Sequence, residues 1–205
     1  MDFAKILPMA FVMIAGPQIL SAIFLATSEN WARNSAAYVT GAALSITAFV
    51  TAAYLLGGGG RDGGPSGDTV YIIILVLLLA AAVHVYVKRE ESEPPKWMGK
   101  LQTATPRFSF TLGFLLLGVF PTDILTSVAV GGYLAAHGDA WVDAIPFILL
   151  TLFFLALPSL LLLIFRERAK AFLPKARNWM NTNSWIVNEI VIGLFIVITI
   201  DSLAG

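Results

Sequence analysis

Six long apolar stretches constrain this chain more than any other feature of its sequence. A helix that crosses a bilayer needs about 20 mostly apolar residues, and in lipid only helices and closed barrels satisfy all their backbone hydrogen bonds. The stretches cover residues 3–27, 36–57, 69–88, 108–135, 140–165 and 184–203. The sequence therefore predicts an all-α polytopic membrane protein with six transmembrane helices.

Composition supports a membrane protein and excludes several functions. Of the 205 residues, 58% are hydrophobic and 13% are charged, and the mean hydropathy is +0.80. Soluble domains carry about 25% charged residues. The absence of cysteine excludes disulfides, thiol redox chemistry and cysteine-ligated metal. Acidic and basic residues are equal in number, so the net charge says nothing about partners, and no basic patch with interleaved aromatic residues suggests nucleic acid.

The basic residues predict the orientation. The loops at 28–35, 88–107 and 166–183 contain one, five and five Lys or Arg residues, whereas the opposite side has only Lys5 and Arg61. By the positive-inside rule, the three basic loops are cytoplasmic and both termini lie outside the cell membrane. We expect the amphipathic stretches 96–101 and 169–179 to anchor at the cytoplasmic headgroups.

The two halves of the chain resemble each other around a proline. The first reads AFVMIAGPQILSA from Ala10, and the second reads GFLLLGVFPTDILTS from Gly113. Three spans separate these segments, so they enter the membrane from opposite sides, as in an inverted 3+3 repeat. We predict a first three-helix repeat at 1–88, a cytoplasmic linker at 89–107 and a second repeat at 108–205.

The two proline segments are the candidate transport site. In inverted-repeat transporters, broken helices meet near the midplane and line the substrate pathway. The candidate residues are Gly16, Pro17 and Gln18 in the first half and Pro121, Thr122 and Asp123 in the second. We expect Thr122 to satisfy a freed backbone group and Asp123 to present a titratable carboxyl to a cavity. The alternative is that both prolines merely kink packed helices and Asp123 reaches the outer interface.

Other polar residues in the spans give weaker signals. Glu189 in the last span either relays a proton or pairs with a cytoplasmic base such as Arg177. His84 reads as an interfacial histidine, and no pair of residues has zinc-like spacing, so we predict no metal site and no cofactor. No serine has a His or Lys partner in a recognisable motif, so we do not expect an enzyme.

Small residues recur along the second predicted span at helical spacing. The stripe consists of Ala37, Gly41, Ser45, Ala48 and Ala52. Such stripes allow helix backbones to approach closely in membranes. We expect packing within one chain, with a homodimer seam as the alternative.

Several motifs together resemble a known family. They are the mid-helix proline of the first span, PKWMGKLQTATP at 95–106, the second proline in a Gly-rich fourth span, and RERAKAFLPKARNWM at 166–180. This order is similar to that of the GAP or sulfolipid-addressing protein (SfLAP) family in the lysine exporter (LysE) superfamily. The resemblance implies a LysE-like fold of six helices and an export role. Some members are associated with moving glycopeptidolipids or sulfolipids.

The second motif departs from the family pattern. Members often carry an Asn-Pro-Lys-Asn motif, where this chain has Phe120-Pro121-Thr122-Asp123. The motif of this chain has lost the lysine and gained the carboxyl group of Asp123. This exchange of a cation for an anion changes the charge of the ligand, or the coupling ion, that the site would suit.

These observations predict a secondary exporter. We expect an integral membrane exporter of a small molecule or (glyco)lipid, coupled to protons through Asp123 or Glu189, with membrane lipids as partners. The alternatives are a divalent cation exporter and a non-transporting scaffold of an export or envelope complex.

Overall fold

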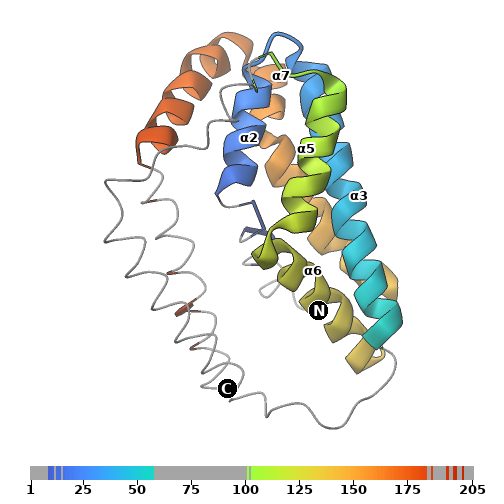
Figure 1. The fold of residues 1–205 in the computed structure, drawn as a ribbon. Helices are drawn as coiled ribbons and strands as arrows, with labels where there is room; N and C mark the ends of the chain where they lie inside the picture. The colour runs from blue at the N-terminus through green and yellow to red at the C-terminus, as the bar shows by residue number, and fades with distance from the viewer. Residues whose placement is uncertain are drawn as a thin grey trace.

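The structure is a computed structural model that describes residues 16–57 and 103–183 almost continuously. Isolated positions are also described, at 9–11, 13–14, 101, 186, 193, 196–197 and 200, and residues 121, 177, 180 and 181 are described by their backbone only. The regular elements in these ranges are all helical (Figure 1). They are α2 (Pro17–Ala26), α3 (Trp31–Gly57), α5 (Pro106–Val119), α6 (Pro121–His137), the 3-10 turn η3 (Trp141–Ala144) and α7 (Ile145–Thr182).

Two helices in the described ranges are long and apolar enough to cross a membrane. They cover Trp31–Leu56 and Trp141–Ala176, and the bent pair α5 and α6 is a third if it counts as one span. The prediction of an all-helical membrane protein is thereby confirmed. The third predicted span and most of the sixth lie outside the described residues, together with Glu189 and His84. The six-span inverted repeat and its domain boundaries therefore stay predictions.

The fourth predicted span is broken at its proline. Helix α5 ends at Val119, Phe120 is extended with φ −67° and ψ 126°, and α6 begins at Pro121. The axes of the two half-helices differ by 69°. Proline disfavours a helical conformation in the residue before it but suits the first position of a new helix. The break at Phe120 therefore follows from the local sequence.

The first predicted span has a corresponding break. Helix α2 begins at Pro17, and the preceding Gly16 has φ 95° and ψ −137°. Glycine adopts this backbone conformation without the penalty that a Cβ would bring. Both prolines thus begin a helix rather than bend a continuous one.

The fifth predicted span continues further than expected. Helix α7 runs to Thr182, but its backbone leaves the helical conformation at Phe165 and Arg166, and the segment beyond takes a different direction (Figure 1). In this second segment Ala169 and Leu173 pack against Ile23 of α2. The amphipathic stretch 169–179 is helical; Ala169 and Leu173 cover a neighbouring helix, whereas Phe172 and Trp179 are exposed.

Helix α3 runs alongside both α5 and α6. Contacts between Gly41 and Phe110 lie near its beginning, and contacts between Val50 and Gly131 lie towards its end. From the first of these contacts to the second, residue numbers increase both in α3 and in the bent pair, so α3 runs parallel to the bent pair. In the stripe of small residues, Gly41 and Ser45 are buried, whereas Ala48 and Ala52 are exposed. The expected packing within one chain is confirmed for Gly41 and Ser45.

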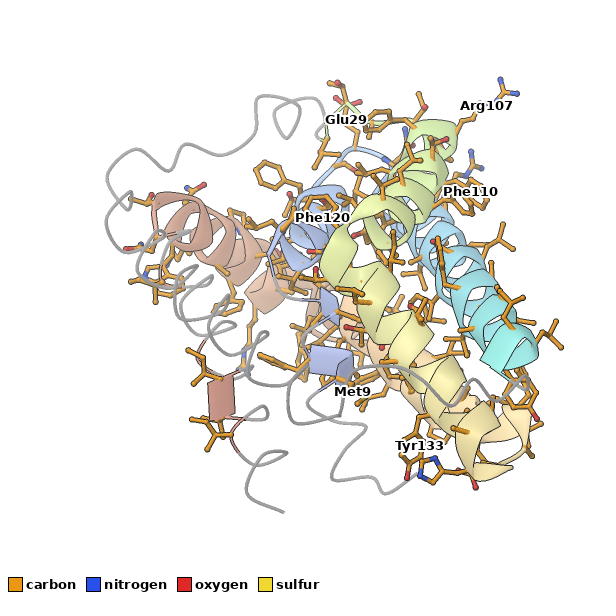
Figure 2. The ribbon with its side chains drawn as sticks, turned by 60° about the horizontal axis from the view of Figure 1, so that its bottom comes forward. Met9, Glu29, Arg107, Phe110, Phe120 and Tyr133 are labelled. Carbon is orange, nitrogen blue, oxygen red and sulfur yellow. The ribbon has the colours of Figure 1, made fainter. Side chains whose placement is uncertain are left out.

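One end of the bundle gathers the described parts of the three basic loops. The α2–α3 turn, the start of α5 and the bend in α7 lie there, because Asn34 binds the carbonyl of Ala104 and Trp31 packs near Leu162. Figure 2 shows Glu29 and Arg107 at this end and Tyr133 at the other. The described parts of the three loops therefore lie at the same end of the bundle. Assignment of that side to the cytoplasm stays a prediction.

Asn34 ties this end together. Its fully buried amide nitrogen donates to the Ser28 hydroxyl and to the Ala104 carbonyl, at 2.9 Å each. We expect Asn34→Ala to lower the free energy of unfolding by about 2 kcal/mol, because it removes both bonds inside the protein. Chemical unfolding in mixed micelles measures this change. Asn30→Ala, at an exposed side chain in the same turn, is the control. Equal stability of the two variants would contradict the role of Asn34.

Candidate functional site

Gln18 and Asp123 bring the two broken segments together inside the protein. The Gln18 Nε2 atom donates to Asp123 Oδ2 at 2.6 Å, across 105 positions of sequence. The side chains are 2% and 0% exposed. Asp123 therefore lies in the interior of the bundle, and the part of the alternative that placed it at the outer interface is wrong. One predicted site residue from each half lies in this pair.

Both residues occupy the first turn of a helix that begins at proline. Gln18 follows Pro17 in α2, and Asp123 is two positions after Pro121 in α6. The beginning of a helix carries partial positive charge from its free N–H groups, which favours a carboxylate there. The breaks therefore position the pair and also provide a favourable electrostatic environment for Asp123.

The pair leaves two buried oxygen atoms unsatisfied. Gln18 Oε1 and Asp123 Oδ1 have no hydrogen-bond partner among the described residues. A buried acceptor without a partner costs about 1–3 kcal/mol. Both free atoms are acceptors, so the site can take up a proton or another hydrogen-bond donor.

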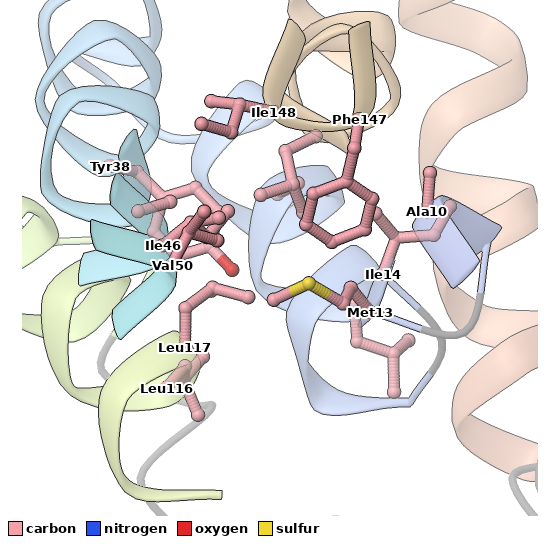
Figure 3. Close-up of a cluster of buried hydrophobic side chains, with 14 of the residues drawn as sticks. Ala10, Met13, Ile14, Tyr38, Ile46, Val50, Leu116, Leu117, Phe147 and Ile148 are labelled. Atoms are coloured by element: carbon pink, nitrogen blue, oxygen red, sulfur yellow. The ribbon is translucent and has the colours of Figure 1, made fainter. Parts of the chain in front are cut away.

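The buried interior that contains the pair has a large apolar cluster. Met13, Phe147 and Leu117 belong to one cluster of buried side chains (Figure 3). The Ser127 hydroxyl lies 4.0 Å from the Met13 sulfur, which connects α6 to the segment before the Gly16 break. The helices of the pair also bury the hydroxyl groups of Ser21, Thr126 and Ser127, so apolar and hydroxyl side chains share this part of the interior.

A separate apolar groove lies beside the first break. Its volume is about 390 Å³, and it is lined by Pro17, Phe108, Leu112, Leu115, Leu116, Val119 and Phe120. The groove follows one face of α5 and reaches Pro17, the residue before Gln18. Neither Gln18 nor Asp123 lines it. Its lining suits a hydrocarbon chain rather than a polar solute.

A comparison with models of protein families identifies the family of the chain. Residues 6–202 match the family described as Sap, sulfolipid-1-addressing protein. The chain belongs to this family. No curated protein and no solved structure matches it. The resemblance to the sulfolipid-addressing family is thereby confirmed, and the family description refers to addressing a lipid rather than to a chemical reaction.

The other predicted site residues have different surroundings in this member of the Sap family. The Thr122 side chain is exposed, and its carbonyl accepts a bond from the Thr126 hydroxyl at 2.7 Å. Gly16 lies against the amide, since a Cβ there would be 3.4 Å from Gln18 Oε1. Glu189 lies outside the described residues. The structure therefore joins Gln18 and Asp123 but does not bring the Thr122 side chain into the pair.

Sequence reasoning did not find Tyr38. Its fully buried hydroxyl donates to the Gln18 carbonyl at 2.9 Å and holds α3 against the first turn of α2. A tyrosine within an apolar span resembles an ordinary packing residue, which explains the omission. Its position one turn before Gly41 was the available signal, because close helix approach lets a long side chain reach the next helix.

The described residues contain no group of three His, Cys, Asp or Glu side chains that could hold a metal ion. Asp123 has an amide as its polar neighbour, not a second carboxylate. These residues therefore give the alternative of a divalent cation exporter no specific support.

Proposed function

We propose that this protein is a secondary exporter that moves an amphiphilic, lipid-like cargo across the cell membrane. The observation that carries the proposal is the buried Gln18–Asp123 hydrogen bond between two half-helices that begin at proline. The apolar groove beside Pro17 supports a cargo with a hydrocarbon part. Membership of a family named for addressing a sulfolipid supports the same cargo class.

The proposed architecture is a LysE-like inverted repeat of six transmembrane helices. The two breaks are its strongest support, because helices interrupted at corresponding positions mark the binding site in such folds. In this arrangement the basic end faces the cytoplasm and the termini lie outside. Gly16 and Phe120 are the positions at which the half-helices would move relative to their neighbours.

Proton coupling is proposed at Asp123. A carboxylate enclosed by apolar side chains is costly unless it is paired, and a bound proton removes that cost. The proton would occupy Oδ1, the oxygen that the amide leaves free. A proton and a donor group of the cargo would compete for this atom, which is the requirement for exchange of one against the other. Glu189 is proposed as a second carboxyl on the proton pathway.

Transport in liposomes tests the proposal. We expect purified protein to move a short-chain fluorescent glycolipid between leaflets, faster when the compartment that receives the lipid is acidic, because protons then enter as cargo leaves. Asp123→Asn should slow transport about tenfold and remove its dependence on the pH gradient. Asp139→Asn, the same change two residues beyond the end of α6, should transport normally. Rates that ignore both the gradient and the Asp123 substitution would refute the proposed coupling.

A scaffold without transport activity is the second candidate. The full burial of the pair favours it, because the apolar groove beside Pro17 does not reach Asp123. A scaffold predicts no lipid movement in the same liposomes and stable association with a partner. Failure of every probe to move, with a folded protein present, would favour this reading.

A further inference from the structure

The geometry points to a cargo whose polar group donates hydrogen bonds or carries positive charge, held by Gln18 Oε1 and Asp123 Oδ1. This inference rests on the proposed function, since it names the class of group that the same site recognises. It concerns the two oxygen atoms that the hydrogen bond between Gln18 and Asp123 leaves free.

The chemistry of the two free oxygen atoms determines which cargo group the site would bind. The amide nitrogen of Gln18 is directed to Asp123, so the amide oxygen and one carboxylate oxygen stay open. An amide oxygen and a carboxylate accept hydrogen bonds and attract cations, and an ionised carboxylate donates none. Two neighbouring sugar hydroxyls, which donate one hydrogen each, or one ammonium group, which donates up to three, would satisfy both atoms. A sulfate or phosphate group would bring further acceptors and a like charge.

No basic side chain changes this preference in the described part of the chain. The Lys and Arg side chains that the structure describes are Arg33, Arg107 and four within residues 166–175 of α7. They lie at the end of the bundle where the basic loops gather, or beyond the bend in α7. The titratable group that faces the pair from α3 is Tyr38, and its hydroxyl already donates to the Gln18 carbonyl. Helices α5 and α7 contribute apolar side chains to this core, including Leu117 and Phe147 (Figure 3).

The apolar groove indicates the second part of the proposed cargo, which is a hydrocarbon chain. It is lined by apolar side chains and contains Pro17, the neighbour of Gln18 in the first turn of α2. A hydrocarbon chain in the groove would therefore end near the two acceptors once the break at Gly16 moves. The inferred cargo is an amphiphile with a neutral hydroxyl-rich or cationic head.

Three amphiphiles with the same chain test the inference: decylamine, decyl glucoside and decyl sulfate. Binding is measured as the shift in thermal unfolding of the protein in nanodiscs at neutral pH. We expect decylamine and decyl glucoside to act on the wild-type protein at concentrations about tenfold lower than decyl sulfate. Acidification should weaken the binding of decylamine and strengthen the binding of decyl sulfate, because protonation of Asp123 removes its negative charge.

The variants separate recognition from general effects on the membrane. The double variant Gln18→Leu/Asp123→Leu should respond equally to all three probes, and Asp139→Asn should keep the wild-type order. Decyl sulfate acting on wild type as strongly as decylamine would overturn the inference. The inference would also be overturned if the double variant kept the wild-type order of the three probes, ranked by the concentration at which each acts. If the order is found but no lipid moves in liposomes, the proposed export fails while the recognition stands.

Discussion

Replacing Gly41 or Gly113 with alanine is expected to destabilise the protein by about 3 kcal/mol. A Cβ on Gly41 would overlap the Phe110 carbonyl oxygen and lie 2.9 Å from the Phe114 nitrogen. A Cβ on Gly113 would overlap the Tyr38 carbonyl oxygen. The obstacles are backbone atoms of helices, which cannot rotate away as a side chain can, so α3 and α5 would have to separate.

Gly132 provides the matched control for this prediction. It lies in α6, and a Cβ there would meet no atom within 4 Å. Gly132→Ala should leave stability unchanged or raise it slightly, because alanine favours a helix by about 1 kcal/mol over glycine. Unfolding of the three variants in mixed micelles measures the difference. A Gly113→Ala protein as stable as Gly132→Ala would show that α3 and α5 do not pack this closely.

The Gln18→Leu substitution is expected to cost about 2 kcal/mol of stability, because it leaves Asp123 buried without its partner. Adding Asp123→Leu should restore most of this loss, since the second change removes the unpaired carboxyl. Replacement of both members of a buried polar pair by apolar residues is often neutral or stabilising, whereas removal of one is costly.

A double-mutant cycle measures this coupling. The free energies of unfolding of wild type, both single variants and the double variant give the interaction energy of the pair. We expect the double variant to be more stable than Gln18→Leu while lacking transport. Additive effects of the two substitutions would mean that the two side chains do not interact in the folded protein.

The breaks in the helices could be predicted because they depend on local chemistry. Proline lacks an N–H group and restricts the residue before it, which favours a break at Pro17 and Pro121. Proline alone does not enforce a break, because α7 continues through Pro158 and Pro174. The position of the described parts of the basic loops at one end of the bundle could also be predicted, from the lengths of the apolar stretches between them. The extension of α7 past Phe165 could not, because a charged run such as 166–170 is compatible with both a loop and a helix.

The pairing at the candidate site was predicted only in outline. The repeat indicated that Gln18 and Asp123 belong to corresponding segments, but not that one donates to the other. That bond depends on the close packing of α3 against α5 and on the anchoring of α2 by Tyr38. Thr122, adjacent to Asp123, has an exposed side chain because successive residues of a helix point in different directions.

By itself the sequence determined that this chain is a helical membrane protein, that helices break at Pro17 and Pro121, and which polar residues stand at these two breaks. These properties follow from hydrophobic length and from the geometry of proline, which act within a few residues. The tertiary structure alone decided which polar atoms meet and which acceptors stay free. The reason is that contacts between residues 105 positions apart are set by how closely helix backbones approach.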